Sequence, residues 1–200
     1  MRKLLLCSMV FMLLSLPTMA SPQLDEANTK FTYQGKPIHP FLLEKFSNWL
    51  SDNKPPIITS ADVAASFDTN EFENNIVKSL DNSWWFAERG KDVTDYASFS
   101  YKWLGKTANG THVVEVGANG GGSGFFMGLM FFKFLEGEIT AGDKAQKQIL
   151  MTIVRTYVLG DRYEGEIKVY PDRVVIPKSK DQYGGGAIDH DVELRFSVRD

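Results

Sequence analysis

The stretch FFMGLMFFKFL, residues 125–135, decides the fold of this chain. Apart from Lys133, it carries no charged or polar side chain on either face. Successive side chains of a strand point to opposite sides of a sheet, so this strand belongs in the middle of a sheet that is covered on both sides. A helix that starts at Ser123 is the alternative, because serine can cap a helix. We predict the strand, with an amino-terminal helix as one cover.

Short runs of aromatic and β-branched residues surround this stretch, separated by Gly, Asn, Asp and Pro, which is typical of antiparallel sheets. Asn109-Gly110 suits a tight hairpin, and Tyr170-Pro171-Asp172-Arg173 suits a type I turn. Apolar and polar residues alternate from Val192 to Arg199, which indicates a strand with one buried face. Strands are predicted near residues 83–88, 97–106, 111–117, 124–135, 149–159, 165–170, 173–177 and 191–199.

A helix is predicted from Pro40, because Phe41, Leu42 and Phe46 recur at helical spacing, and Pro55-Pro56 ends it. Residues 57–80 are ambiguous. Ser60 or Asp62 could cap a short helix, and residues 70–80 favour helix over irregular strand. The polar residues 21–30 are expected to form a flexible amino-terminal segment.

These elements predict an α+β fold in which one or two amino-terminal helices pack on an antiparallel sheet of about seven or eight strands. Such a sheet could curl toward a barrel. Residues 31–200 are expected to form a single globular domain of ordinary size.

The first twenty residues have the pattern of a secretory signal peptide. Arg2 and Lys3 are followed by an apolar run over residues 4–16, and Pro17-Thr18-Met19-Ala20 is a small-residue cleavage pattern. Cleavage after Ala20 is expected, and the apolar run is too short to cross a bilayer comfortably. We therefore expect a soluble protein in a bacterial periplasm or in the medium.

Removal of this segment also removes Cys7, the only cysteine, so the remaining chain cannot form a disulfide. Without Arg2 and Lys3 the formal net charge falls from −3 to −5. An acidic chain with no cluster of Lys or Arg is a poor candidate for binding nucleic acid or an anionic membrane. We expect neither nucleic-acid binding nor stable membrane insertion.

A glycine-rich motif follows the run Val113-Val114-Glu115-Val116, at residues 117–124. It resembles the first motif of methyltransferases that bind S-adenosylmethionine, in which an acidic residue and glycines surround the cofactor. That resemblance implies several βαβ units after the motif, whereas the rest of the chain has the pattern of hairpins. A connection between adjacent strands is the preferred interpretation, either purely structural or exposing backbone groups to a partner.

Catalytic and metal-binding patterns are incomplete. Ser123 followed by aspartates and His190 has the order of a hydrolase triad, but Phe125 stands where the serine elbow requires glycine. Asp189-His190-Asp191 is the one local group of metal ligands, and an extended chain would point its members to opposite sides. We predict no catalytic residues, no metal and no cofactor.

Aromatic residues offer a further candidate. Trp84-Trp85-Phe86, with Trp49 and Trp103, could line a cleft for a sugar or an apolar ligand. Aromatic residues on strands more often form core, and core is the preferred interpretation.

The functional expectation is a non-catalytic exported protein that binds a protein partner or a small envelope ligand, for example an inhibitor or an immunity-type protein. An envelope hydrolase acting on glycan or peptide is the alternative. A second glycine-rich segment lies at residues 183–187. The two glycine-rich loops are the expected contact surface, with these residues: Asn119, Gly120, Gly121, Gly122, Ser123, Tyr183, Gly184, Gly185 and His190.

Overall fold

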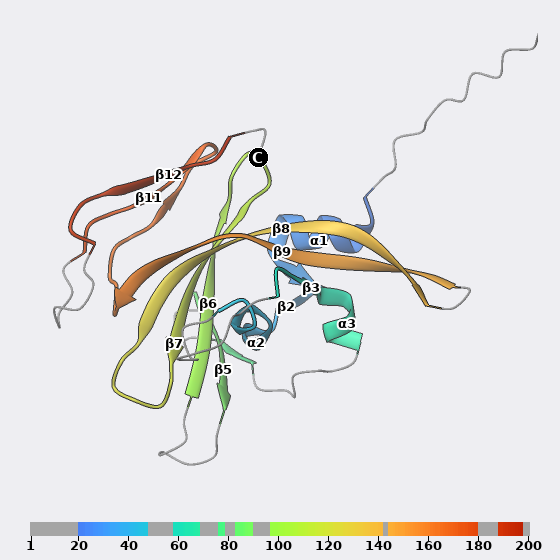
Figure 1. The fold of residues 1–200 in the computed structure, drawn as a ribbon, viewed down its shortest axis with the longest axis horizontal. Helices are drawn as coiled ribbons and strands as arrows, with labels where there is room; N and C mark the ends of the chain where they lie inside the picture. Colours follow the sequence, from blue (N-terminus) through green and yellow to red (C-terminus); the bar gives the residue numbers. More distant parts are fainter. Residues whose placement is uncertain are drawn as a thin grey trace, which may run out of the picture.

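A computed structural model describes residues 20–47, 58–68, 76–78, 83–89, 97–141, 144–179 and 188–197. The described chain is rich in strands and has few helices (Figure 1). The helices are α1 (Pro22–Lys30), α2 (Pro40–Glu44) and α3 (Val63–Asp68). The strands are β1 (Thr32–Tyr33), β2 (Lys36–Pro37), β3 (Ser60–Asp62), β4 (Ile76–Lys78), β5 (Trp85–Arg89), β6 (Ala97–Lys106), β7 (His112–Asn119), β8 (Phe126–Ala141), β9 (Lys144–Asp161), β10 (Lys168–Val169), β11 (Arg173–Ile176) and β12 (Val192–Arg195).

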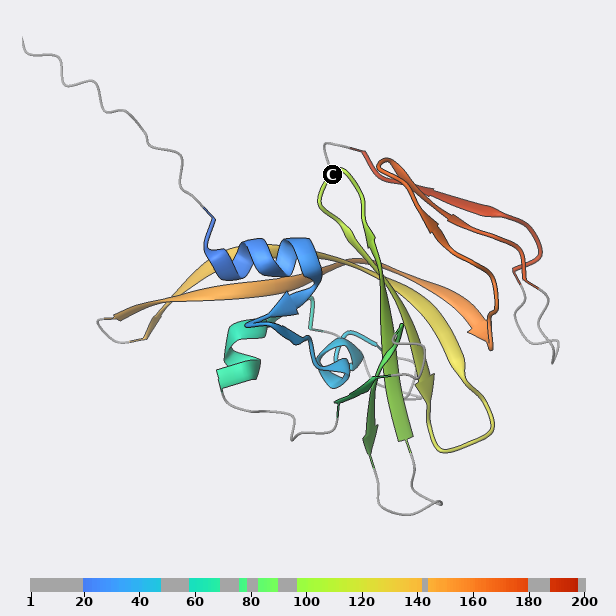
Figure 2. The ribbon, with the colours of Figure 1, turned by 180° about the vertical axis from the view of Figure 1, so that it is seen from behind.

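The main sheet is antiparallel and strongly curled, with the strand order β3-β9-β8-β7-β6-β5-β4 (Figures 1 and 2). The long β8–β9 hairpin extends past the other strands of this sheet. A separate sheet contains β10, β11 and β12. The prediction of a β-rich chain with a curled antiparallel sheet is confirmed, and the described strands divide among three sheets, the third of them the pair β1-β2, rather than forming one.

Strand β8 is buried on both faces between Met127 and Phe134, within the stretch that its sequence predicts, whereas Phe126 and Leu135 are half exposed. Met130, Phe132 and Phe134 belong to one apolar core, and Leu129 and Phe131 belong to a second core on the opposite face. Successive side chains of β8 point to opposite faces of the sheet and therefore contribute to two separate cores. The helix considered from Ser123 does not form.

The first core lies between the main sheet and the amino-terminal segments. Helix α1 contacts β8, and α2 contacts β5 and β6. Phe31 ends α1 in a left-handed conformation (φ 55°) and is 2% exposed, and its ring stacks parallel to Trp103 with centroids 6.5 Å apart. Burial of this aromatic ring offsets the backbone strain at that position.

The second core lies between the main sheet and the carboxy-terminal sheet, which carries Val174, Ile176 and Leu194. Two hydrogen bonds fix this sheet to the β6–β7 turn: Ala108 N donates to Pro171 O (2.7 Å), and Asn109 Nδ2 donates to Ser197 O (3.0 Å). The sequence assigned covering elements only to the amino terminus, so this second cover was not predicted.

Both predicted turns form. Gly110 has a φ of 82° in the β6–β7 hairpin, the left-handed conformation for which glycine was predicted there. Tyr170 N donates to Arg173 O (2.8 Å) between β10 and β11.

The sequence led us to expect a flexible segment at residues 21–30, whereas residues 22–30 form helix α1. Ser21 Oγ accepts a hydrogen bond from Leu24 N (3.2 Å), and Pro22 stands in the first turn. Ala27 is fully buried. Leu24 also packs against the first core, so α1 is held by its cap and by apolar contacts that its polar composition does not reveal.

The ambiguous region resolves in part. Asp62 Oδ1 accepts from Ala65 N (3.2 Å) and caps α3, as was considered for that residue. Residues 76–78 form an edge strand rather than the helix that was favoured there. In the described part of the chain, no helix is long and apolar enough to cross a membrane.

Candidate functional site

The first predicted loop connects β7 to β8. Asn119 organises it: its Oδ1 accepts from Gly121 N (2.7 Å), and its Nδ2 donates to Gly122 O (3.1 Å). Gly121 has a φ of 94°, which favours glycine. Gly120, Gly122 and Ser123 are exposed. Because β7 and β8 are antiparallel neighbours, the glycine-rich motif is a strand connection and does not open a βαβ unit.

The second predicted loop is described only in part. Tyr183, Gly184 and Gly185 lie outside the described residues. His190 is exposed, and its Nδ1 is hydrogen bonded to Asp189 Oδ1, which lowers the pKa of that carboxyl group. The β7–β8 connection and β12 lie apart in both views, so the described parts of the two predicted loops are not brought together (Figures 1 and 2).

The three histidines are also dispersed. His39 caps α2, where its Nδ1 accepts from Phe41 N (3.1 Å), and His112 is fully buried in the first core. Burial lowers the pKa of His112 to about 4, and the Lys106 charge adds to the effect. No group of three His, Cys, Asp or Glu side chains within the described ranges could hold a metal ion.

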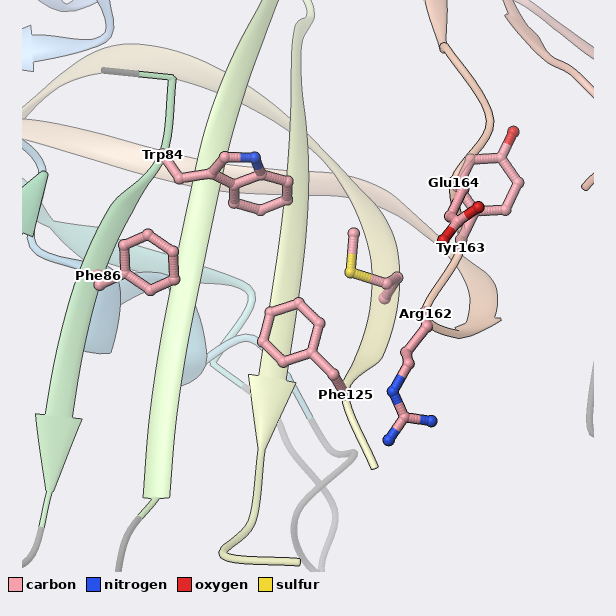
Figure 3. A pocket seen from close by; sticks show the side chains of 7 residues that line it. Trp84, Phe86, Phe125, Arg162, Tyr163 and Glu164 are labelled. Atoms are coloured by element: carbon pink, nitrogen blue, oxygen red, sulfur yellow. The ribbon is translucent and has the colours of Figure 1, made fainter. Parts of the chain in front are cut away.

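A pocket of about 270 Å³ lies beside the end of the glycine-rich connection (Figure 3). Three aromatic rings come from its β5 and β8 sides, and the three residues after β9 form the opposite side. Its lining residues are Trp84, Phe86, Phe125, Met127, Arg162, Tyr163 and Glu164. We call this the aromatic pocket.

Small residues of the main sheet leave room for this pocket. Phe86 pairs with Ser100, Ser100 with Gly117, and Gly117 with Met127, so these residues form one row across four strands. The two middle members are small, and the Phe125 ring lies over Gly117. A methyl group at Gly117 would meet Phe125 Cε1 at 2.5 Å, so only glycine allows this ring position.

Hydrogen bonds hold Phe125 against the end of β9. Phe125 N donates to Asp161 Oδ1 (2.8 Å), and Arg162 N donates to Phe125 O (2.9 Å). The Arg162 guanidinium donates to Asp161 Oδ2 (2.7 Å) and to Ser123 O. The glycine-rich connection is thereby fixed at its β8 end, where it contributes a wall of the pocket.

A buried carboxyl group lies next to this row. Glu115 is 8% exposed and precedes Gly117 by two residues on β7, so both face the second core. Burial raises the pKa of Glu115 to about 7, against a smaller opposing effect of the Lys102 charge. Burial likewise raises the pKa of Tyr163 to about 12, and the charges of Glu115, Asp191 and Tyr157 add to this. Glu115 can therefore change its charge near neutral pH.

A second hollow of about 400 Å³ lies on the carboxy-terminal sheet. Lys168, Lys178, Glu166 and Asp191 give its lining charges of both signs, and Lys178 N already donates to Asp191 Oδ1 (2.9 Å). The aromatic pocket is the more distinctive candidate, because it presents several rings to one space.

Sequence reasoning considered one part of this site, although it preferred core for those residues. It named the Trp84-Trp85-Phe86 cluster as a possible cleft, and the structure turns Trp84 and Phe86 into the pocket while Trp85 packs against the first core. Alternate residues of a strand face opposite sides of the sheet, so the sequence itself indicates that Trp84 and Phe86 lie on one side and Trp85 on the other. Glu115 was noted only as part of the glycine motif, and residues 162–164 were not selected, because only the return of β9 brings them to this place.

Neither a family model, nor a curated protein, nor a solved structure matches this chain.

Proposed function

We propose that this chain is a non-catalytic binding protein that holds a small ligand in the aromatic pocket. The observation that carries the proposal is the gathering of Trp84, Phe86 and Phe125 around one open space of about 270 Å³. Ligand sites are concave and mainly apolar, with a few polar groups that fix orientation. Glu164 and Arg162 are such groups at the edge of this pocket.

Binding is favoured over catalysis because the nearby polar groups already serve the structure. Tyr163 Oη donates to Pro177 O (2.7 Å), and the Arg162 guanidinium is held by Asp161. A general base needs a nucleophile within about 3 Å, and the described lining residues present no such pair.

The place of action is part of the same proposal. The charged, apolar and small-residue pattern of residues 1–20 supports export, and we propose that the protein works in a bacterial periplasm or outside the cell. The ligand is then a molecule of the cell envelope or of the medium.

The test is a fluorescence titration of residues 21–200 with N-phenyl-1-naphthylamine, an uncharged aromatic probe. Phe125→Ala removes a wall of the pocket, and we expect its Kd for the probe to rise about ten-fold, the low end of the effect for a buried aromatic ring. Phe126→Ala is the matched control, because Phe126 is the next residue but does not line the pocket. Its Kd should stay unchanged.

The melting temperature of each variant shows whether it remains folded. Equal Kd values for the two variants, or no saturable binding to the unmodified chain, would contradict a ligand site in this pocket.

A further inference from the structure

The charge around the aromatic pocket is unbalanced. Arg162 is the one cationic lining residue, and its guanidinium is directed away from the three rings toward Asp161 and the Ser123 carbonyl group (Figure 3). Glu164 also lines the pocket and is exposed, and its carboxylate makes no ion pair with any described residue. Once Arg162 and Asp161 neutralise each other, the lining keeps one negative charge.

Glu115 adds a second carboxyl group beneath this lining. It lies on the same face of β7 as Gly117, and its neighbours across the sheet are Lys102 on β6 and Leu129 on β8. Lys102 is not part of the pocket lining, and it forms no ion pair with Glu115 at 4.0 Å or less. The Lys102 charge therefore offsets the effect of burial on this carboxyl group only in part.

The aromatic rings of the pocket also favour a positively charged ligand. The face of an aromatic ring carries negative potential and attracts cations, most strongly when water is excluded. The rings of Trp84, Phe86 and Phe125 lie on one side of the pocket, and Glu164 lies on the other (Figure 3). A neutral apolar molecule would use the rings alone, whereas an organic cation uses both the rings and the carboxylates.

We propose that the ligand of the aromatic pocket is a small organic cation, such as a quaternary ammonium compound, held against Trp84, Phe86 and Phe125 and balanced by Glu164 and Glu115. This inference rests on the proposed function and specifies its ligand class. An inorganic metal ion does not fit, because no group of metal ligands is gathered among the described residues.

The buried carboxyl group gives the proposal a pH signature. The pKa of Glu115 is raised to about 7, so this group is mostly protonated at pH 6 and mostly ionised at pH 8. The charged or titratable groups that interact with it are Lys102 on β6 and Tyr163 after β9, and Tyr163 in turn interacts with Asp191 and Tyr157. Cation affinity should rise between pH 6 and pH 8, because a cation favours the ionised form.

The experiment compares choline with 3,3-dimethylbutan-1-ol, its uncharged analogue in which carbon replaces the ammonium nitrogen. Both are titrated into residues 21–200 by calorimetry at pH 6 and pH 8. At pH 8 we expect choline to bind about ten-fold more tightly than the alcohol, which is a typical effect of cation–π contacts in a partly desolvated site. The alcohol should show no pH dependence.

Glu164→Gln should remove most of this preference for choline. Glu166→Gln is its matched control, since Glu166 is also exposed and lies two residues further along the chain, outside the pocket. Glu115→Gln should abolish the pH dependence while N-phenyl-1-naphthylamine still binds.

Equal affinity for choline and the alcohol, or binding of neither while N-phenyl-1-naphthylamine still binds, would overturn the inference about charge and leave the apolar site standing. If N-phenyl-1-naphthylamine also fails to bind, the proposed ligand site itself is contradicted.

Discussion

Gly117→Ala tests the closest contact in the aromatic pocket. The added methyl group would clash with Phe125 Cζ and lie 2.5 Å from Phe125 Cε1, and ordinary contacts begin at 3.4 Å, so the ring must retreat by about 1 Å. The retreat is opposed by the hydrogen bonds of Phe125 N to Asp161 and of Phe125 O to Arg162. Overpacking of this kind costs about 1–3 kcal/mol of unfolding free energy.

For a chain of this size, that cost corresponds to a fall in melting temperature of roughly 2–12 °C. Calorimetry or circular dichroism would measure it. The displaced ring also narrows the pocket, so binding of N-phenyl-1-naphthylamine should weaken. Gly122→Ala is the matched control, because a methyl group there meets nothing within 4 Å.

A double-mutant cycle isolates the cause. When Phe125→Ala has already removed the ring, Gly117→Ala should be almost neutral, because the two nearest atoms are gone and the third, Ser100 Oγ, lies at 3.1 Å. If Gly117→Ala costs the same with and without the Phe125 ring, the ring does not lie over Gly117 and this account of the pocket is wrong.

Three further predictions concern the buried polar groups and the amino terminus. The pKa of Glu115 is raised from 4.5 to about 7, so its ionisation costs the folded chain about 3 kcal/mol, and stability from this group falls as pH rises from about 4.5 to about 7. Glu115→Gln should therefore stabilise the chain at pH 8 relative to pH 4 in urea titrations, and an unchanged difference between the two pH values would contradict this. Tyr163→Phe removes the hydrogen bond to Pro177 O and should cost about 1 kcal/mol in the same assay, whereas a neutral effect would show that this bond contributes nothing. Intact-mass measurement of the protein recovered from a bacterial envelope or medium fraction should show a chain that begins at Ser21, and retention of Met1 would contradict export by cleavage.

The sequence predicted the parts of the fold that depend on local pattern. Two apolar faces along residues 125–135 placed that strand inside a covered sheet, and Asn109-Gly110 placed a hairpin. It did not predict what covers the second face, because the carboxy-terminal strands reach that face through apolar packing and hydrogen bonds between residues far apart in the sequence, such as Ala108 and Pro171.

The candidate site was predicted less completely, for the same physical reason. The aromatic cluster at Trp84 and Phe86 was visible, but its role depends on Phe125 and on residues 162–164, which meet only when β9 returns beside β8. Glu115 looks like part of a glycine motif in the sequence, and only its burial next to Gly117 gives it a raised pKa.

The most direct test of a ligand site in the aromatic pocket uses the methionine methyl groups. Of the seven methionines, three follow residue 20: Met127 in the pocket, and Met130 and Met151 in the first core, on the opposite face of the sheet. Residues 21–200 labelled with ¹³C at these methyl groups should give three signals, and N-phenyl-1-naphthylamine should shift the Met127 signal in a saturable manner through its ring current. Met130 and Met151 should stay in place. A Met127 signal that does not move, or equal shifts of all three, would contradict binding in this pocket.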